Sequence, residues 1–486
     1  MNSSSIYQEQ AVTNGAPHLE ADVAVIGAGL SGLTAAYRLS QQGRSVVVLE
    51  ASDRVGGRTV NLEVAPGVVV DGGAQWIGGK HTEMFDLLDE LGIDTFDSYT
   101  AGRTIYQRRG VRADFKGTIP PLKRAVLADF AQAQFRLEVM AGRVPDGKPW
   151  QAAKSDIWDG TSLGHWLDRN CLTPEARDLF TFCFTTMLAD DPHRVSLLSV
   201  LHQIRTCGGL EYMINTEDGA QETRIQGGSQ RVSLALAERL GDRVVLGAPV
   251  TAIRSDRHGV TIDATRGAVR AQRVIVAMTP ADADRIDFSP DLPTRRAELQ
   301  RAWHNGTENK VFAVYPSPFW RQRGLNGTAL ADLPVARYVT DASPADGSVG
   351  VLLAFVGTAS DGPGLTWPET ILDDERRRHR ELLRDLVTLF GPQAAEPLRI
   401  VEQNWTAEPW ISGCVSTRAP GVLTRYTDAA LTPVGRVHWA GTEAAEEFEG
   451  YLEGAVRAAD RAVAEVLAQL PRLDAQLTSR AEYAHF

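Results

Sequence analysis

One stretch near the N-terminus limits the folds open to this chain more than any other feature. Residues 21–51 read ADVAVIGAGLSGLTAAYRLSQQGRSVVVLEA. An apolar run is followed by a glycine turn, an amphipathic alanine-rich segment and a second apolar run. Apolar runs on both sides of a helical pattern are typical of a βαβ unit whose parallel strands are buried on both faces. The stretch therefore predicts an α/β fold.

The turn inside this unit has the spacing G-x-G-x-x-G, formed by Gly27, Gly29 and Gly32, and Glu50 ends the second apolar run. Glycine lets the backbone approach a pyrophosphate at a helix N-terminus. A carboxylate after the second strand accepts hydrogen bonds from ribose hydroxyls. Strand, turn, helix, second strand and acid occur in the required order, so the unit is predicted to bind a dinucleotide.

A second cluster of glycine and arginine follows directly in EASDRVGGRT, residues 50–59. It contributes Arg54, Gly57 and Arg58, which could reach the same pyrophosphate again. A charged surface turn would have the same composition.

Two later apolar segments resemble the strands of the opening unit. These are RVIVAMTP at 273–280 and GRVHWAGTE at 435–443. We expect one sheet assembled from these three distant parts of the chain. Residues 118–215 are mostly helical in pattern and 308–356 alternate as strands, so we interpret them as a second domain inserted twice.

Composition excludes several classes of function. The net charge of -11 over 486 residues, without a basic stripe, argues against a nucleic-acid partner. Four scattered cysteines give neither a disulfide framework nor a zinc motif, and His193 and His304 lack metal-ligand spacing. Neither terminal segment reads as a signal peptide or a membrane span. We therefore expect a cytoplasmic protein with no metal and no membrane partner.

Several motifs, in this order, resemble the flavin-dependent amine oxidase family, which includes the monoamine and polyamine oxidases. The resemblance covers about residues 20–468. It rests on VIGAGLSGLTAA, LEASDRVGGRT, DGGAQWIG, IQGGSQRVSLALAERLGDRVVLGAPVTAI, NKVFAVYPSPFW, the NW pair at 404–405 and HWAGTEAAEEFEGYLEGAVRAADRAV.

The resemblance implies an α/β, monoamine oxidase-like architecture: a Rossmann-type FAD-binding domain interleaved with an α+β substrate-binding domain. The FAD-binding domain is expected at 19–100, 216–300 and 405–468, and the substrate-binding domain at 101–215 and 301–404. Residues 1–18 form a leader and 469–486 a C-terminal tail.

FAD is the cofactor that the family implies. A helix that begins near Tyr451 would aim its first N–H groups at the flavin pyrimidine, where a helix N-terminus stabilises developing negative charge. Besides the glycines, Glu50 and the arginine cluster, the matching cofactor positions are Gln75, Trp76, Val250, Trp405, Cys414, Gly441, Thr442, Glu443, Tyr451 and Leu452.

Two residues are expected to act at the reacting end of the cofactor. Lys310 matches the family lysine that holds a water against flavin N5. Tyr451 matches one wall of an aromatic cage around the amine. Val415 stands where several members carry the second ring, so that wall stays unassigned. Cys414 matches the cysteine that bonds flavin in some members, but its neighbours differ from theirs, and we expect noncovalent FAD.

The substrate positions that the resemblance implies are Trp76, Met187, Met213, Ile214, Gln221, Arg337 and Tyr338. Arg337, located with a one-residue ambiguity, would suit a carboxylate-bearing substrate, and a solvated arginine is the alternative. The acidic residues Glu446, Glu447 and Glu449 could draw cationic amines to the cavity rim, or could form a solvated loop.

The implied reaction is oxidation of an amine to an imine by hydride transfer to flavin N5. Hydrolysis then gives an aldehyde or ketone, and oxygen is reduced to hydrogen peroxide. An L-amino-acid oxidase on the same scaffold is the near alternative, and a flavin-bound interaction protein without turnover is another. A homodimer is also considered. The sequence does not identify the amine.

Overall fold

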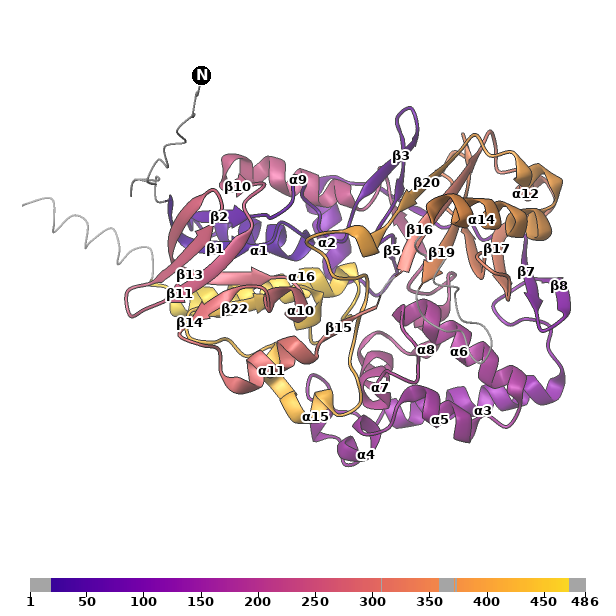
Figure 1. Cartoon of the computed structure of the whole chain (residues 1–486), viewed down its shortest axis with the longest axis horizontal. Coiled ribbons are helices and arrows are strands. Elements are labelled where there is room, and N and C mark those ends of the chain that lie inside the picture. The colour runs from indigo at the N-terminus through magenta and orange to yellow at the C-terminus, as the bar shows by residue number, and fades with distance from the viewer. Residues whose placement is uncertain (1–18, 307, 358–370, 372–373, 472–486) are drawn as a thin grey trace, which may run out of the picture.

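The computed structural model describes residues 19–306, 308–357, 371 and 374–471. It contains two large sheets (Figure 1). The first has the order β10-β2-β1-β13-β12-β11-β14, and β22 also pairs with β13. Its strands are β1 (Leu19–Ile26), β2 (Val46–Leu49), β10 (Val244–Val245), β11 (Val250–Ser255), β12 (Val260–Ala264), β13 (Gly267–Ala277), β14 (Asp287–Ser289) and β22 (Val437–Ala440).

The centre of this sheet confirms the expected assembly from three distant segments. Strand β13 pairs in parallel with β1, so that Val274 lies beside Ala24. It also pairs in parallel with β22, where Val274 lies beside Val437. Because parallel strands point the same way, the carboxyl ends of all three meet at one edge of the sheet.

Helices cover one face of the first sheet: α1 (Leu30–Gln41), α2 (Thr82–Leu91), α9 (Gln230–Leu240) and α16 (Leu452–Gln469). Within β1, Val23 and Val25 pack in the same cluster as these helices, whereas Ala24 and Ile26 pack on the opposite face. This two-residue alternation is the geometry of a strand buried on both sides.

The second sheet has the order β20-β16-β19-β18-β17-β7-β8. In Figure 1 it lies at the upper right, with α14 (Glu375–Phe390) beside it. Its strands are β7 (Arg103–Arg108), β8 (Val111–Phe115), β16 (Glu308–Tyr315), β17 (Leu325–Ala331), β18 (Tyr338–Asp341), β19 (Gly350–Gly357) and β20 (Arg399–Gln403). The strands expected between 308 and 356 are therefore confirmed.

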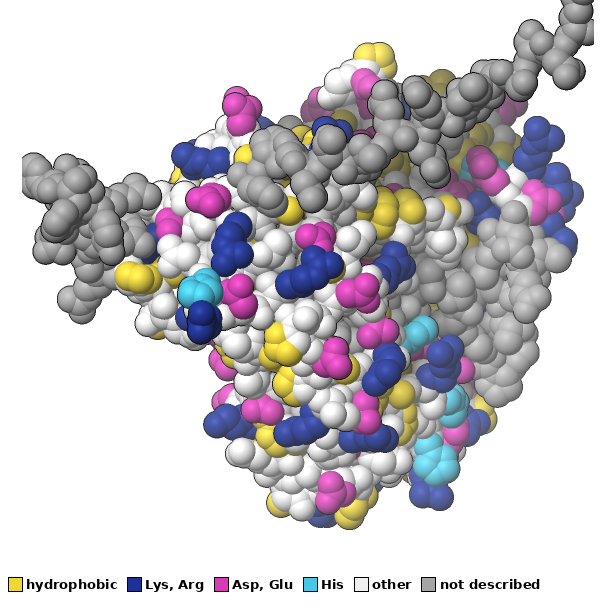
Figure 2. All heavy atoms as spheres, turned by 60° about the vertical axis from the view of Figure 1, so that its left-hand side comes forward, with side chains coloured by type: hydrophobic (Ala, Val, Ile, Leu, Met, Phe, Trp, Pro, Cys, Tyr) yellow, Lys and Arg dark blue, Asp and Glu magenta, His cyan; other side chains and the backbone are white. Residues whose placement is uncertain are grey.

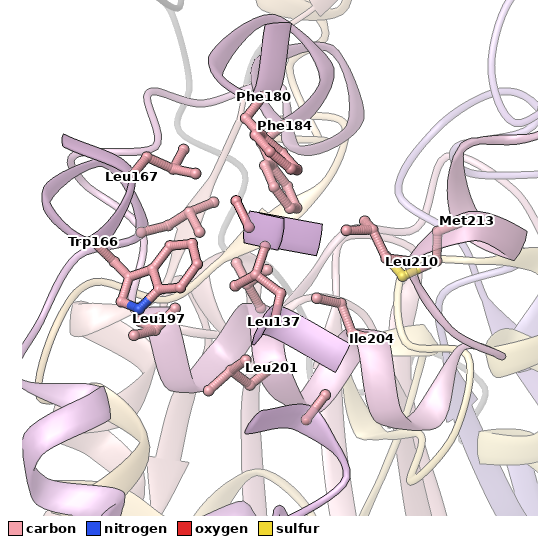
Figure 3. Packing of buried hydrophobic residues seen from close by; sticks show 14 of the residues in the cluster. Leu137, Trp166, Leu167, Phe180, Phe184, Leu197, Leu201, Ile204, Leu210 and Met213 are labelled. Atoms are coloured by element: carbon pink, nitrogen blue, oxygen red, sulfur yellow. The ribbon is translucent and has the colours of Figure 1, made fainter. Parts of the chain in front are cut away.

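A helical layer lies below the second sheet in Figure 1. It consists of α3 (Arg124–Ala141), α4 (Ser155–Asp159), α5 (Leu163–Asn170), α6 (Pro174–Leu188), α7 (Leu197–Thr206) and α8 (Leu210–Ile214), as the pattern over 118–215 predicted. Leu137, Phe180, Phe184 and Leu201 pack together in its core (Figure 3). Met213 lies at the edge of the same cluster.

Short elements join these layers. The small strands are β3 (Asn61–Ala65), β4 (Val68–Asp71), β5 (Trp76–Ile77), β6 (Thr95–Asp97), β9 (Thr223–Ile225), β15 (His304–Asn305) and β21 (Ser416–Thr417). The short helices are α10 (Pro280–Ala283), α11 (Thr294–Ala302), α12 (Phe319–Gln322) and α15 (Val422–Tyr426). On the face shown in Figure 2, acidic and basic side chains are interspersed rather than gathered by sign.

The glycines of the first turn have different structural roles. A Cβ on Gly32 would lie 2.0 Å from the carbonyl oxygen of Gly27, which is well inside van der Waals contact. A Cβ on Gly29 would come no closer than 3.9 Å, to the Cα of Gly57, and Gly29 has an ordinary φ of -71°. Gly32 therefore permits the packing of α1 on the turn, whereas a methyl group on Gly29 would make only ordinary van der Waals contact.

These geometries predict that alanine lowers the stability of the protein at position 32 but not at position 29. Gly32→Ala should lower the free energy of unfolding of the flavin-free protein by about 1–3 kcal/mol or more, because the methyl group overpacks the turn. Gly29→Ala is the matched control and should leave stability nearly unchanged. Urea denaturation measures both values, and equal stability of the two variants would contradict this assignment.

Candidate active site

A cavity of about 1180 Å³ lies between the two sheets and the helical layer and receives residues from all three. Ligand pockets of proteins usually measure about 300–1,000 Å³, so this one has room for a dinucleotide together with a substrate. Most of the residues named from the sequence line it: Gly27, Gly29, Glu50, Arg54, Gly57, Arg58, Gln75, Trp76, Met187, Met213, Ile214, Gln221, Val250, Lys310, Tyr338, Trp405, Cys414, Gly441, Thr442, Tyr451 and Leu452.

Three of the named cofactor and substrate positions do not line this cavity: Gly32, Glu443 and Arg337. Gly32 packs under the turn, as described above. The buried carboxylate of Glu443 instead forms an ion pair with Arg58 at 2.8 Å and accepts a hydrogen bond from Ser416. It holds the Arg58 guanidinium at the cavity wall. Burial alone would lower the pKa of Arg58, but the Glu443 charge keeps it above its ordinary value.

The one-residue ambiguity at 337 and 338 concerns two side chains that lie differently in the structure. Tyr338 begins β18 and lines the cavity, whereas the side chain of Arg337 is buried away from it. Burial raises the pKa of the Asp385 carboxyl, and the charge of the nearby Arg337 acts against that rise. The expected contact between Arg337 and a substrate carboxylate therefore has no support in this geometry.

The acid at the end of β2 is fixed to the glycine turn. Glu50 accepts one hydrogen bond from the N–H of Ala28 at 2.6 Å and another from the N–H of Ser52 at 2.8 Å. Burial raises its pKa despite these bonds. A carboxylate has about four acceptor sites, so Glu50 keeps lone pairs for ribose hydroxyls at the cavity.

The start of α16 also faces the cavity, through Tyr451 and Leu452. The first N–H groups of a helix have no partners within it, and they carry a partial positive charge. Thr442 anchors this helix start: its hydroxyl accepts from the N–H of Gly450 at 2.7 Å and donates to the carbonyl of Tyr451 at 3.1 Å. A Cβ on Gly454 would lie 2.2 Å from the carbonyl oxygen of Phe448, so glycine is required there.

Lys310 enters the cavity from β16. Strand alternation places it on the same face as Phe312 and Val314, and its backbone pairs with Phe355 of β19. The three N–H bonds of its ammonium point to the carbonyls of Asp71 and Gly73, at 3.1 and 2.7 Å, and to Oε1 of Gln75 at 2.9 Å. A water on Lys310, as the resemblance implies, would require one of these bonds to be released.

Aromatic rings surround this ammonium. Trp76 stacks on Phe355 with centroids 6.0 Å apart, and Tyr338 stacks on the same ring at 5.5 Å. The Lys310 nitrogen lies 5.4 and 5.2 Å from the centroids of Trp76 and Phe355. Phe355 was not expected from the sequence, because its role depends on the register between β19 and β16.

Tyr451 is supported from behind by a second set of rings. His81 is fully buried, and its ring centroid lies 5.4 Å from that of Tyr451 and 4.9 Å from that of Phe448. Burial, together with the charge of Arg457, lowers the pKa of His81 to about 4, so it stays neutral near pH 7. Val415 lines the cavity where the second cage ring was left unassigned.

The thiol of Cys414 lines the same cavity, and burial raises its pKa to about 11. At neutral pH it is therefore a thiol and a poor nucleophile. Its backbone is well fixed, because its N–H donates to Gly306 and its carbonyl accepts from Arg58 at 3.0 Å.

The residues present fit a flavin dinucleotide. Gly27 and Gly29 of the glycine turn line the cavity, acceptor sites remain on Glu50, and the N-terminus of α16 lies at the same cavity. Gln75 is 2% exposed, and its Nε2 has no acceptor among the described residues, so it can donate to a bound group. Across the described ranges, no cluster of three or more His, Cys, Asp and Glu side chains could hold a metal ion.

Comparison with known proteins identifies the class. The model of the flavin-containing amine oxidoreductase family matches residues 30–467, and the chain therefore belongs to this family of oxidoreductases. The AofH protein of Mycobacterium tuberculosis is 39% identical over 464 residues, which cover 95% of this chain and 99% of that protein. Flavin-containing amine oxidase B of Homo sapiens is 34% identical over 457 residues, which cover 92% of this chain and 86% of that enzyme.

Solved structures agree with this class. Putrescine oxidase bound to putrescine aligns with a TM-score of 0.87 at 33% identity, covering 93% of this chain and all of that one. Cyclohexylamine oxidase from Brevibacterium oxydans aligns with the same score at 36% identity and the same coverage. The expected α/β monoamine oxidase-like fold and the flavin-dependent amine oxidase class are thus confirmed. In the part of the chain that the structure describes, no helix is both long and apolar enough to span a membrane.

The burial of Lys310 predicts a pH dependence of stability. Burial lowers its pKa to about 8, from 10.5 in an unfolded chain. Between these values the unfolded state binds more protons, so the contribution of this group to stability rises with pH. In flavin-free protein, wild type should therefore gain about 3 kcal/mol relative to Lys310→Met as the pH rises from 8 to 10.5.

Urea denaturation at several pH values measures this difference. Lys123→Met, at an exposed lysine, serves as the control and should show no such trend. A gap between wild type and Lys310→Met that stays constant with pH would contradict the lowering of the Lys310 pKa by burial.

Proposed function

We propose that this chain is an FAD-dependent amine oxidase acting on amines without a carboxylate. The observation that carries the proposal is one cavity lined at once by the glycine turn with Glu50, by the start of α16 and by the buried Lys310 with its aromatic rings. A bound flavin would supply the hydride acceptor, N5, for the carbon next to the amine nitrogen, and oxygen would be the final acceptor with hydrogen peroxide as its product. The imine product hydrolyses to an aldehyde or ketone.

The chain's own groups have separate parts in this proposal. Gly27, Gly29 and Glu50 hold the adenosine and pyrophosphate end. The N–H groups at the start of α16 stabilise negative charge on the flavin pyrimidine. The ring of Tyr451 orients the amine.

Lys310 fixes the segment that carries Gln75 and Trp76, and it binds a water when one of its three bonds is released. The stacked rings of Trp76, Phe355 and Tyr338, with Met187, Met213, Ile214 and Gln221, line the cavity against bulk water. This arrangement favours the neutral form of the amine.

We also propose the division of the chain given above, with FAD bound by 19–100, 216–300 and 405–468 and substrate by 101–215 and 301–404. A cytoplasmic location, oxygen as the acceptor and a homodimer belong to the same proposal. The 1–18 leader lies outside the described residues, and so does all of the 469–486 tail beyond residue 471.

Two observations favour amines over amino acids. Arg337, the expected partner of a substrate carboxylate, is buried and does not line the cavity. Two of the solved neighbours are an oxidase bound to putrescine and an oxidase named for cyclohexylamine, and neither amine has a carboxylate. The L-amino-acid oxidase remains the second candidate.

Anaerobic titration of the purified yellow protein tests the proposal. We expect flavin absorbance to be lost with at least one monoamine, diamine or cyclic amine, and to persist with L-amino acids. Bleaching by L-amino acids alone would favour the second candidate. Indifference to every donor would favour a flavin-bound protein without turnover.

The high pKa of the Cys414 thiol predicts noncovalent FAD, because little thiolate is present to bond the flavin. After acid precipitation, the flavin should appear in the supernatant as FAD. Colour that stays with the denatured pellet in wild type and leaves it in Cys414→Ala would show a covalent bond and overturn this expectation.

A further inference from the structure

A second, much smaller cavity adjoins the candidate active site. It measures about 40 Å³, and we call it the inner chamber. Its wall includes His202, Trp303, Arg418 and Glu449. Glu449 also lines the large cavity and is therefore a residue that the two spaces share.

The inner chamber is lined by polar atoms that the protein itself does not satisfy. Both ring nitrogens of His202, Nε1 of Trp303 and Oε2 of Glu449 are buried and have no hydrogen-bond partner among the described residues. These side chains are only 6%, 5% and 3% exposed. Buried polar groups are almost always hydrogen-bonded, and a polar space of this size holds about one water molecule.

The outer wall of the inner chamber reaches the protein surface. It includes the exposed Glu446 and the half-buried Trp150. Water in the chamber would therefore connect bulk solvent to Oε2 of Glu449, and such a water chain can carry protons.

Glu449 is held firmly at this wall. Its Oε1 accepts a hydrogen bond from Arg418 at 2.6 Å. Phe448 and Gly450 on either side have positive φ values of 53° and 89°, so the backbone turns sharply around it. The carboxyl group lies two residues before Tyr451, at the start of α16.

Charges around Glu449 act in both directions. Burial raises its pKa, as does the nearby Glu443, whereas Arg418 and Arg58 oppose that rise. Two neighbours stay neutral near pH 7, because burial lowers the pKa of His202 to about 3 and raises that of Cys207 to about 12. The outer wall of the chamber also carries the acidic side chain of the exposed Glu446. A further negative charge placed in the large cavity would add to the groups that favour protonation.

We propose that Glu449 takes up one proton from solvent, through the inner chamber, when the cofactor in the adjoining cavity is reduced. The inference rests on the proposed function, in which negative charge develops on the flavin near the start of α16. One proton moves from water to Oε2 and forms a neutral carboxyl group, while the two electrons go to the cofactor. Reoxidation returns the proton and makes it available to the oxygen that is reduced.

The pH dependence of the flavin reduction potential tests this directly. For a two-electron couple, each proton taken up contributes about 30 mV per pH unit. With one proton on the flavin and one on Glu449, the holoenzyme should show about 59 mV per pH unit near neutrality. Glu449→Gln, which keeps the shape and an oxygen for Arg418, should show about 30 mV per pH unit.

Glu447→Gln is the matched control, since Glu447 is an exposed neighbour paired with Arg457 and lines neither space. It should keep the steeper slope. Equal slopes in wild type and Glu449→Gln would overturn the inference while leaving the proposed oxidase intact. A purified protein that binds no flavin would overturn both.

A measurement on wild type alone covers the case in which Glu449→Gln fails to fold. The infrared difference spectrum between reduced and oxidised holoenzyme should show a new C=O band of a protonated carboxyl group that shifts in heavy water. Absence of such a band would overturn the inference.

Discussion

The candidate active site depends on the parallel pairing of β13 with two strands that are far from it in sequence. Val274 lies beside Ala24 on one side and beside Val437 on the other. Each of the three strands ends in the segment that supplies cavity residues: the glycine turn after β1, Met278 and Thr279 after β13, and Gly441 and Thr442 after β22. Binding residues in open α/β sheets gather at the carboxyl ends of strands for this reason.

Buried charges then fix the geometry that the strands bring together. The ammonium of Lys310 is held by three acceptors of the 71–75 segment, and the buried carboxylate of Glu443 is paired with the partly exposed Arg58. A buried charge without partners would be costly, so each such group constrains the segment that neutralises it. Stability and positioning therefore come from the same contacts, and a change of partner would displace the cavity wall.

The sequence predicted correctly those features of the site that depend only on residues close to one another in the chain. The glycine turn, the acid at Glu50 and the helix start at Tyr451 each depend on neighbouring residues, and the structure places all of them at the cavity. Tyr338 and Arg337 could not be separated in this way, because a shift of one residue in a strand moves a side chain to the other face. Phe355 was missed because its place beside Lys310 is a matter of register between two strands.

The environments of the glutamates in the acidic segment 443–453 could not be predicted from the sequence, because they depend on partners from distant parts of the chain. As a sequence it reads as a charged loop, but its glutamates have different environments. Glu446 is exposed, whereas Glu449 is buried against Arg418, from a segment that the local pattern does not include. The rim role considered for Glu449 is therefore wrong, since its carboxylate is 3% exposed and already paired.

Glu453 shows why this segment needs so much charge. It is completely buried, and its carboxylate accepts hydrogen bonds from the N–H groups of Met84 and Glu83 in the first turn of α2. His81, the residue before α2, provides no side-chain cap. Glu453 of α16 therefore accepts from N–H groups that have no partner within α2. The start of α16 therefore faces the cavity, and Glu453 of the same helix caps the start of α2. Acidic side chains near the start of α16 thus join the layers around the cavity, while Gly454 permits the close approach of the Phe448 carbonyl and Gly450 adopts the positive φ of 89° in the turn before the helix.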